Sequence, residues 1–232
     1  MRLDRWISNY TGLSRQDVRR ALKAQQISVN GALATAADQP VSEADTVLLA
    51  GDRICAPQPR YFMLHKPAGY VCANSDSEHP VVLDLLDEDN KHSLQIAGRL
   101  DLDTTGLVLI TDDGTWNHRV TAPSRKCRKT YRVILDAPLH DEAADKLRTG
   151  VLLQNEKKPT QSAGLDFVDD NDRRTVLLSI HEGKYHQVKR MLAAVGYHVV
   201  ALHREQVGDI TLDATLPLGA YRPLTPAEIA SV

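Results

Sequence analysis

The chain has 232 residues, of which 42% are hydrophobic and 25% are charged, and its formal net charge is −2. This composition is typical of a soluble globular protein and leaves room for one large domain, or for a large and a small one. No apolar run is long enough to span a membrane, and the first residues, MRLDRWISNY, lack the apolar segment of a secretory signal, so we expect a cytosolic protein without a membrane partner.

The first 30 residues differ in charge from the rest of the chain. Because the whole chain is close to neutral, any nucleic acid must be bound by local basic patches. Residues 1–30 carry six cations against two anions, the cations being Arg2, Arg5, Arg15, Arg19, Arg20 and Lys23. From charge alone, a solvated helix face is the more common explanation of such a pattern.

Two local signals organise this basic segment. Ser14, with Asp17 three residues later, predicts a capped helix over about 15–25. Helical spacing places Arg15, Arg19 and Lys23 on one face. The following ISVNGAL predicts a β-hairpin that turns at Asn30-Gly31. A small module should therefore end near residue 50.

Residues 51–59, GDRICAPQP, contain a glycine and two prolines and are expected to form a linker. From residue 60 to 232, expected strands such as LVLI (107–110), TYRVIL (130–135) and TVLLSI (175–180) are mixed with expected helices in DEAADKLRTG and HQVKRMLAAVG. Strands and helices do not alternate regularly. We therefore predict an α+β fold with a mixed sheet rather than a doubly wound parallel one.

The stretch GRLDLDTTGLVLITDDG (98–114) places Asp101 and Asp103 in a Thr- and Gly-rich loop before a buried strand. Loops at strand ends often carry catalytic groups, but the residues alone favour a carboxylate that caps a turn. The same residues fit the D-x-D-x-T pattern of Mg²⁺-dependent phosphatases. That pattern normally follows an apolar strand, whereas here the apolar strand comes after the loop.

A metal site is not expected. The three cysteines are odd in number and widely spaced, and the histidines near residues 181–203 have no cysteine partners.

The first 49 residues resemble the S4-type RNA-binding module, through RLDRWI, SRQDVRRAL and ISVNG in that order. The resemblance implies RNA-facing positions at Arg2, Arg5, Ser14, Arg15, Arg19 and Arg20, and Lys23 shares the same helix face. Contacts of this kind reach phosphates, so they would position RNA without reading its sequence.

The remaining blocks resemble the pseudouridine synthases that modify ribosomal RNA: YFMLHKPAGYVC, GRLD with TTGL, KTYRV, EGKYHQVKRML and GAYRPLTPAEI. The residues of the TTGL and YHQVKRM segments most resemble those of the synthases that modify small-subunit (16S) rRNA. A synthase of the large-subunit rRNA is the alternative. The resemblance implies a pseudouridine synthase fold, with a largely antiparallel mixed sheet flanked by helices.

The implied reaction cuts the bond between C1′ and N1 of a uridine, turns the uracil and rejoins it through C5. Nothing is added or removed, so no cofactor or metal is implied. The essential carboxylate would be Asp101, which attacks C1′ or takes a proton from the sugar. Asp103 matches no catalytic position and is interpreted as a turn residue.

Further roles follow from the same resemblance. Tyr131 would stack on the base or transfer a proton at C5. Lys189, or alternatively Arg190, would pair with Asp101 and keep it ionised. Arg99 would fill the gap that the flipped base leaves in the RNA, and Arg190 could share in this.

A second basic stretch, HRVTAPSRKCRKTYR, is expected to bind phosphates beside the site, through Arg125, Lys126, Arg128 and Lys129. We expect ribosomal RNA, free or in a partly assembled small subunit, as the partner of a monomeric enzyme. A ribosome-binding factor without activity is the alternative of another class, against which the intact GRLD, KTY and HQVKRM blocks argue.

Overall fold

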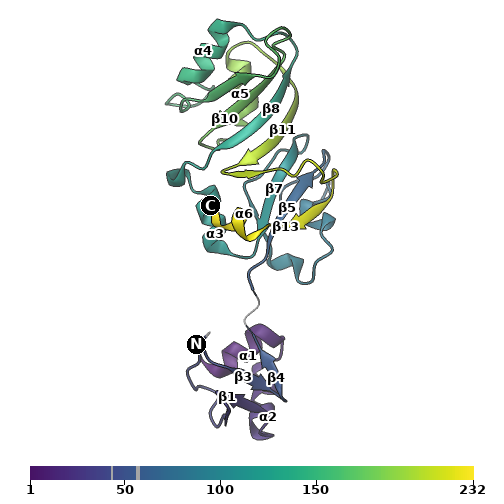
Figure 1. The fold of residues 1–232 in the computed structure, drawn as a ribbon, viewed down its shortest axis with the longest axis vertical. Helices are drawn as coiled ribbons and strands as arrows, with labels where there is room; N and C mark the ends of the chain where they lie inside the picture. Colours follow the sequence, from purple (N-terminus) through teal and green to yellow (C-terminus); the bar gives the residue numbers. More distant parts are fainter. Residues whose placement is uncertain (43, 56–57) are drawn as a thin grey trace. The chain divides into compact units, whose positions relative to one another are not determined.

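The computed structural model describes residues 1–42, 44–55 and 58–232. It divides into two compact units, Met1–Gln58 (the N-terminal unit) and Pro59–Val232 (the C-terminal unit) (Figure 1). Within the described residues, no helix combines the length and apolar character needed to cross a membrane.

The N-terminal unit packs two helices on a small sheet. Helix α1 spans Leu3–Thr11 and α2 spans Arg15–Lys23, and the strands β1 (Ile27–Val29), β2 (Ala32–Leu33), β3 (Val47–Leu49) and β4 (Asp52–Ile54) form a sheet in the order β2-β1-β3-β4. Leu3, Trp6, Ile7, Val18 and Ile27 lie in its core. The core is therefore shared between both helices and the sheet.

The predicted local signals of this unit are confirmed. The Ser14 side chain accepts a hydrogen bond from the Asp17 backbone N–H, and the Asp17 carboxylate accepts one from the Ser14 N–H, which completes a capping box at the start of α2. Asn30 and Gly31 both have positive φ, 52° and 83°, as the predicted tight hairpin turn requires.

The predicted linker over 51–59 is wrong for its first part. Residues Asp52–Ile54 form β4, which pairs antiparallel with β3, and Ile54 is buried in the core of the unit. The glycine that suggested a linker, Gly51, instead turns the chain back with a φ of 96°. Pairing satisfies the backbone groups of β3 that would otherwise remain at an open edge. Residues 56 and 57 lie outside the described residues.

The C-terminal unit is built on a nine-stranded sheet in the order β13-β5-β7-β11-β8-β10-β9, with β6 paired to β7 and β12 to β11. Only the pair of β7 and β11 is parallel. The predicted α+β fold with a mixed, largely antiparallel sheet is therefore confirmed. The strands are β5 (Tyr61–Lys66), β6 (Gln95–Ala97), β7 (Thr105–Thr111), β8 (Lys129–Leu135), β9 (Gly164–Phe167), β10 (Thr175–Ile180), β11 (Val199–Val207), β12 (Ile210–Thr211) and β13 (Tyr221–Pro223).

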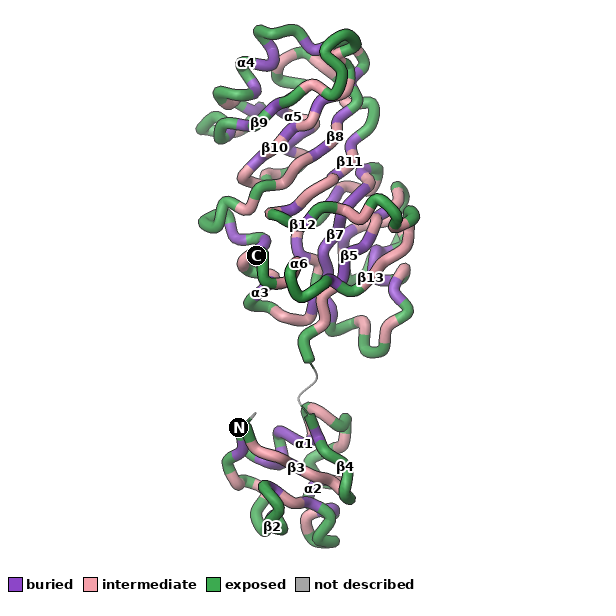
Figure 2. The backbone as a smooth tube through the Cα atoms, viewed as in Figure 1, coloured by how far each residue is buried: buried purple, intermediate pink, exposed green. Residues whose placement is uncertain are grey.

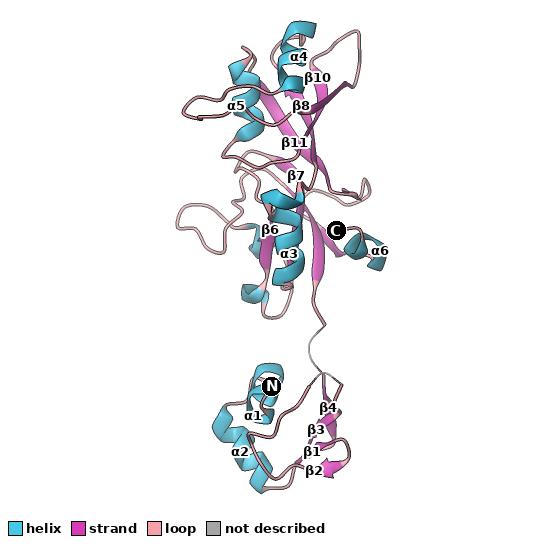
Figure 3. Cartoon of the chain, turned by 90° about the vertical axis from the view of Figure 1, so that its left-hand side faces the viewer, coloured by secondary structure: helices cyan, strands magenta, loops and turns pink. Residues whose placement is uncertain are grey.

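Helices cover the two halves of this sheet. Helix α4 (Asp141–Thr149) lies beside β9 and α5 (Gln187–Ala194) lies beside β11, and their common core includes Val133, Val176 and Leu192. Helices α3 (Gly114–Thr121) and α6 (Pro226–Ala230) contribute Trp116 and Ile229 to a second core. Figure 3 shows α3 beside β6, and Figure 2 shows the buried strands between the covering elements. Short 3-10 helices span Val82–Leu85, Lys91–Ser93 and Pro123–Arg125.

The parallel contact of β7 with β11 requires a glycine. Gly106 has a φ of 108°, and a Cβ at this position would lie 2.3 Å from the carbonyl oxygen of Arg204. No other residue allows the two backbones to come this close. This contact lies where the loop at 98–104 leads into β7. The short strand β6, which precedes that loop, was not predicted from the sequence.

Candidate active site

The loop at 98–104, which carries Asp101, is fixed from one side by the buried side chain of Arg204 on β11. The guanidinium of Arg204 donates hydrogen bonds to the carbonyl oxygens of Gly98 at 2.7 Å, Leu107 at 2.8 Å and Arg99 at 3.4 Å. One side chain thus fixes the start of the loop and the strand that follows it.

Lys66, at the end of β5, fixes the other end of the loop. It is fully buried, and its Nζ donates to the carbonyl oxygens of Thr104 at 2.7 Å, Pro67 at 3.1 Å and Leu102 at 3.2 Å. Burial lowers the pKa of Lys66, and the nearby thiol of Cys72 and the carboxyls of Asp103 and Asp101 act in the opposite direction. Two buried cations therefore hold the loop through its backbone.

Asp101 faces two side chains of the segment that begins α5. The Nε2 atom of His186 lies 3.3 Å from Asp101 Oδ1, and the Nζ of Lys189 lies 3.7 Å from Oδ2. The Asp101 side chain is 28% exposed, so it is accessible but partly shielded. The ammonium of Lys189 therefore places a positive charge beside this carboxylate.

Lys189 is shared with Asp103. Its Nζ donates to both oxygens of the Asp103 carboxylate, at 2.6 and 2.8 Å. The hydrogen bond from Lys189 lowers the pKa of Asp103, with partial burial acting against it. Asp103 was interpreted as a turn residue, but its side chain, which is 72% exposed, reaches across to α5.

A cavity of about 760 Å³ opens beside Asp101. Tyr131, from β8, lines it and is largely buried, while Arg99 lines it and is exposed. The structure thus brings Asp101, Tyr131 and Arg99, which were predicted from different parts of the sequence, to one cavity. Cys72 also lies there, and its Sγ accepts a hydrogen bond from the Leu100 N–H at 3.3 Å.

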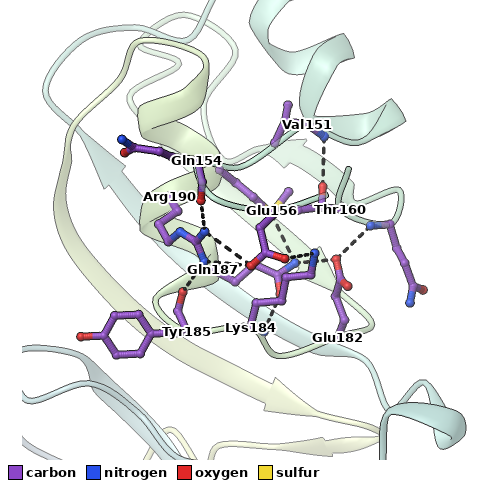
Figure 4. A network of polar contacts seen from close by, with 11 residues as sticks. Val151, Gln154, Glu156, Thr160, Glu182, Lys184, Tyr185, Gln187 and Arg190 are labelled. Carbon is purple, nitrogen blue, oxygen red and sulfur yellow. Dashed lines mark hydrogen bonds and ion pairs between the residues drawn. The ribbon is translucent and has the colours of Figure 1, made fainter. Parts of the chain in front are cut away.

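Arg190 makes other contacts. Its guanidinium donates to the carbonyl oxygens of Gln154 at 2.7 Å and Tyr185 at 3.1 Å, and lies 3.4 Å from the Glu156 carboxylate (Figure 4). In the described part of the chain, the ion pairs of Asp101 are with His186 and Lys189. The geometry therefore favours Lys189 over Arg190 as the cation at Asp101, and gives Arg190 a structural position.

The second basic stretch divides into two groups. Arg125, Lys126 and Arg128 are exposed, as expected for residues that could reach phosphates. Lys129 is half-buried and lines the cavity instead, with its Nζ 3.5 Å from the carbonyl oxygen of Val120. Burial lowers the pKa of Lys129.

In the N-terminal unit, several predicted RNA-facing side chains are exposed, namely Arg5, Arg15, Arg19 and Lys23. Two exposed arginines have intramolecular partners, since Arg2 pairs with Asp4 and Arg20 pairs with Asp17. The Ser14 hydroxyl takes part in the cap of α2.

Sequence reasoning missed four residues of this arrangement: Lys66, Asp103, His186 and Arg204. The sequence signal for these two residues was weak: Lys66 ends the strand YFMLHK, and Arg204 lies among other polar residues in VVALHREQV. A charged residue is almost never fully buried unless it is paired. Among the described residues, no cluster of three or more His, Cys, Asp or Glu side chains is arranged to hold a metal ion.

Comparisons with known proteins identify the family of the chain. The family model described as RNA pseudouridylate synthase matches residues 60–194. A "Ribosomal small subunit pseudouridine synthase A" of Yersinia pestis is 50% identical over all of this chain and 98% of the relative, and that of Escherichia coli (strain K12) is 49% identical over the full length of both. A solved structure titled "Crystal structure of pseudouridylate synthase" superposes with a TM-score of 0.72 at 42% identity, over 100% of this chain and 99% of the other. The chain belongs to the family of RNA pseudouridine synthases.

Proposed function

We propose that this enzyme converts a specific uridine of the small-subunit (16S) ribosomal RNA to pseudouridine, with Asp101 as the acting carboxylate. One observation carries the assignment of the residue: Asp101 lies in a cavity of about 760 Å³ that Tyr131 also lines, on a loop held by two buried cations. The small-subunit substrate is supported by relatives near 50% identity that bear this specificity in their names.

The reaction requires the protein mainly to position the reacting groups. The C1′–N1 bond breaks, the uracil turns, and a bond forms between C1′ and C5, after which the C5 proton is lost and N1 is protonated. Asp101 either attacks C1′ or accepts a proton from the sugar, and both uses need an ionised carboxylate. The ammonium of Lys189 lies 3.7 Å from Asp101 Oδ2, beside the reacting carboxylate. Lys66 and Arg204 hold the loop, so the carboxylate keeps its position while the base turns.

The other residues have supporting roles in this proposal. Tyr131 contacts the uracil within the cavity, and Arg99, exposed at the same cavity, occupies the position that the flipped base vacates. The exposed basic side chains of the N-terminal unit and of the loop at 125–128 bind phosphates.

Because one chain supplies Asp101, Tyr131 and Lys189, we infer that the monomer is sufficient for activity. We also infer that it works in the cytoplasm, on free rRNA or on an assembling subunit.

The test is to map pseudouridines in ribosomal RNA from cells that lack this protein, complemented with the wild type or with Asp101→Asn. We expect one pseudouridine of the small-subunit RNA to disappear and to return only with the wild type. If the missing modification lies in the large-subunit RNA, the substrate assignment is wrong. If all modifications remain, the chain is a ribosome-binding factor without this activity.

A further inference from the structure

Tyr185 lies at the cavity beside Asp101 and exposes 74% of its surface, more than the other large hydrophobic residues of the described chain. Its ring is stacked on His186, with ring centroids 3.8 Å apart and planes 19° from parallel. One face of the tyrosine is therefore covered by the imidazole, and the other is free. Covering an exposed aromatic ring removes apolar surface from water, which is favourable in free energy, so an exposed ring of this kind often marks a binding site.

The backbone that carries this pair is held firmly. Arg190 donates to the carbonyl oxygen of Tyr185, and the Gln187 side chain accepts from the Lys184 N–H at 2.8 Å and donates to Glu182 at 2.8 Å (Figure 4). Glu156 accepts from Lys184 at 3.2 Å and also faces Arg190, which connects this turn to the loop at 151–160. Figure 4 shows the Tyr185 ring extending away from these contacts.

His186 connects the exposed ring to the reacting centre. It is the N-cap residue that precedes α5, with a left-handed φ of 47°, and its Nε2 lies 3.3 Å from Asp101 Oδ1 while its ring stacks on Tyr185. Such a conformation is uncommon for a residue other than glycine and is maintained by the surrounding contacts. The imidazole of His186 thus contacts both the Tyr185 ring and the Asp101 carboxylate.

We propose that the Tyr185–His186 pair is a stacking platform for a nucleobase that flanks the target uridine in the RNA. The inference rests on the proposed function and extends it. When the target uridine turns out of its stack, its neighbour loses a stacking partner. The free face of Tyr185, fixed beside the cavity, replaces that partner. Stacking on an aromatic ring accepts any base, because every base has a π face.

The experiment compares the wild type with Tyr185→Ala on an RNA that contains the target, and on the same RNA with an abasic nucleotide at the 5′ or the 3′ neighbour of the target. Single-turnover rates over a range of enzyme concentrations give the half-saturating concentration and the plateau rate. On the intact RNA, we expect Tyr185→Ala to raise the half-saturating concentration about tenfold. On one of the two abasic RNAs, the two enzymes should differ by less than about twofold, because the stacking partner is already gone.

Two further variants separate stacking from structural damage. Tyr185→Phe keeps the ring and should behave as the wild type. Leu152→Ala removes a side chain that is exposed to a similar degree, 61%, and does not line the cavity, so it should also leave the half-saturating concentration unchanged.

The proposal is overturned if Tyr185→Ala binds as the wild type, or if its loss is as large on both abasic RNAs as on the intact one. It is also overturned if only the plateau rate falls, since the ring would then act on the target uracil itself. If the wild type makes no pseudouridine at all, the proposed function fails, and equilibrium binding of the same RNAs still tests the platform.

Discussion

The ammonium of Lys189 lies 2.6 Å from an oxygen of Asp103, but 3.7 Å from the nearest oxygen of Asp101. The cation expected to serve the proposed catalytic carboxylate is therefore hydrogen-bonded to its neighbour, two residues along the same loop. Asp103 holds Lys189 beside Asp101 at a distance too long for a hydrogen bond, and the Asp101 side chain remains 28% exposed at the cavity.

This arrangement separates the roles of the two carboxylates. We expect Asp101→Asn to abolish uridine isomerisation and to leave RNA affinity within a few-fold of the wild type, because only the reacting group is changed. Asp103→Asn should retain clear activity, since Lys189 can still approach Asp101. Single-turnover assays with RNA-binding measurements check both. Equal loss in the two variants, together with a requirement for Mg²⁺, would support phosphatase chemistry instead.

Lys66 is expected to be needed for the stability of the loop. Lys66→Met keeps most of the apolar stem but leaves the carbonyl oxygens of Leu102 and Thr104 without their buried donor. The free energy of unfolding should fall by roughly 2–4 kcal/mol, and the turnover rate should fall with it. Urea denaturation and single-turnover rates measure the two effects. Lys146→Met, which removes an exposed pair with Glu142, is the control and should cost less than about 0.5 kcal/mol.

The N-terminal unit should be dispensable for folding of the rest. Removing residues 1–58 deletes a unit with its own core, and β5, the next strand, belongs to the other sheet. The shortened protein should unfold in one cooperative thermal transition and bind RNA more weakly. A product that is insoluble or lacks a cooperative transition would show that the two units depend on each other for stability.

The exposed basic face of α2 should contribute affinity without sequence specificity. We expect Arg15→Ala combined with Arg19→Ala to weaken target and non-target RNA by similar factors, because phosphates carry no sequence information. The slope of log affinity against log salt should decrease by roughly 0.7–0.9 per lost contact. The rate at saturating RNA should hardly change. A loss limited to the target RNA, with the salt slope preserved, would mean that this face reads bases or shape.

The carboxylate of Glu228 should make stability depend on acid pH. Hydrogen bonds from Arg222 and from the start of α6 lower the pKa of Glu228 from 4.5 to about 2. Because the pKa of Glu228 is lower in the folded than in the unfolded chain, its ionised form stabilises the folded state at pH values above the unfolded pKa. This stabilisation is lost as the pH falls, here between about pH 5 and pH 2. Glu228→Gln should therefore be less stable than the wild type by on the order of 2 kcal/mol at pH 7, and by less at pH 3. Denaturation curves at both pH values provide the test, and an equal difference at both would contradict it.

The sequence by itself determined the features that depend on neighbouring residues. The capping box of Ser14 and Asp17, the turn at Asn30-Gly31 and the alternation that buries Tyr131, Val133 and Leu135 all follow from local backbone and side-chain preferences. The family, and with it the position of Asp101, could be recognised because the motif residues occur in order along the chain.

Only the tertiary structure decided which side chains surround Asp101. Lys66 and Arg204 lie 35 residues before and 103 residues after it, and they meet its loop because β5 pairs with β7 and β7 pairs with β11. Their charges could not be assigned from sequence, since a lysine or arginine is usually solvated unless a fold supplies buried carbonyl oxygens. The strand at Asp52–Ile54 also depends on tertiary structure. It forms because the backbone hydrogen-bonding groups at the edge of β3 need a partner.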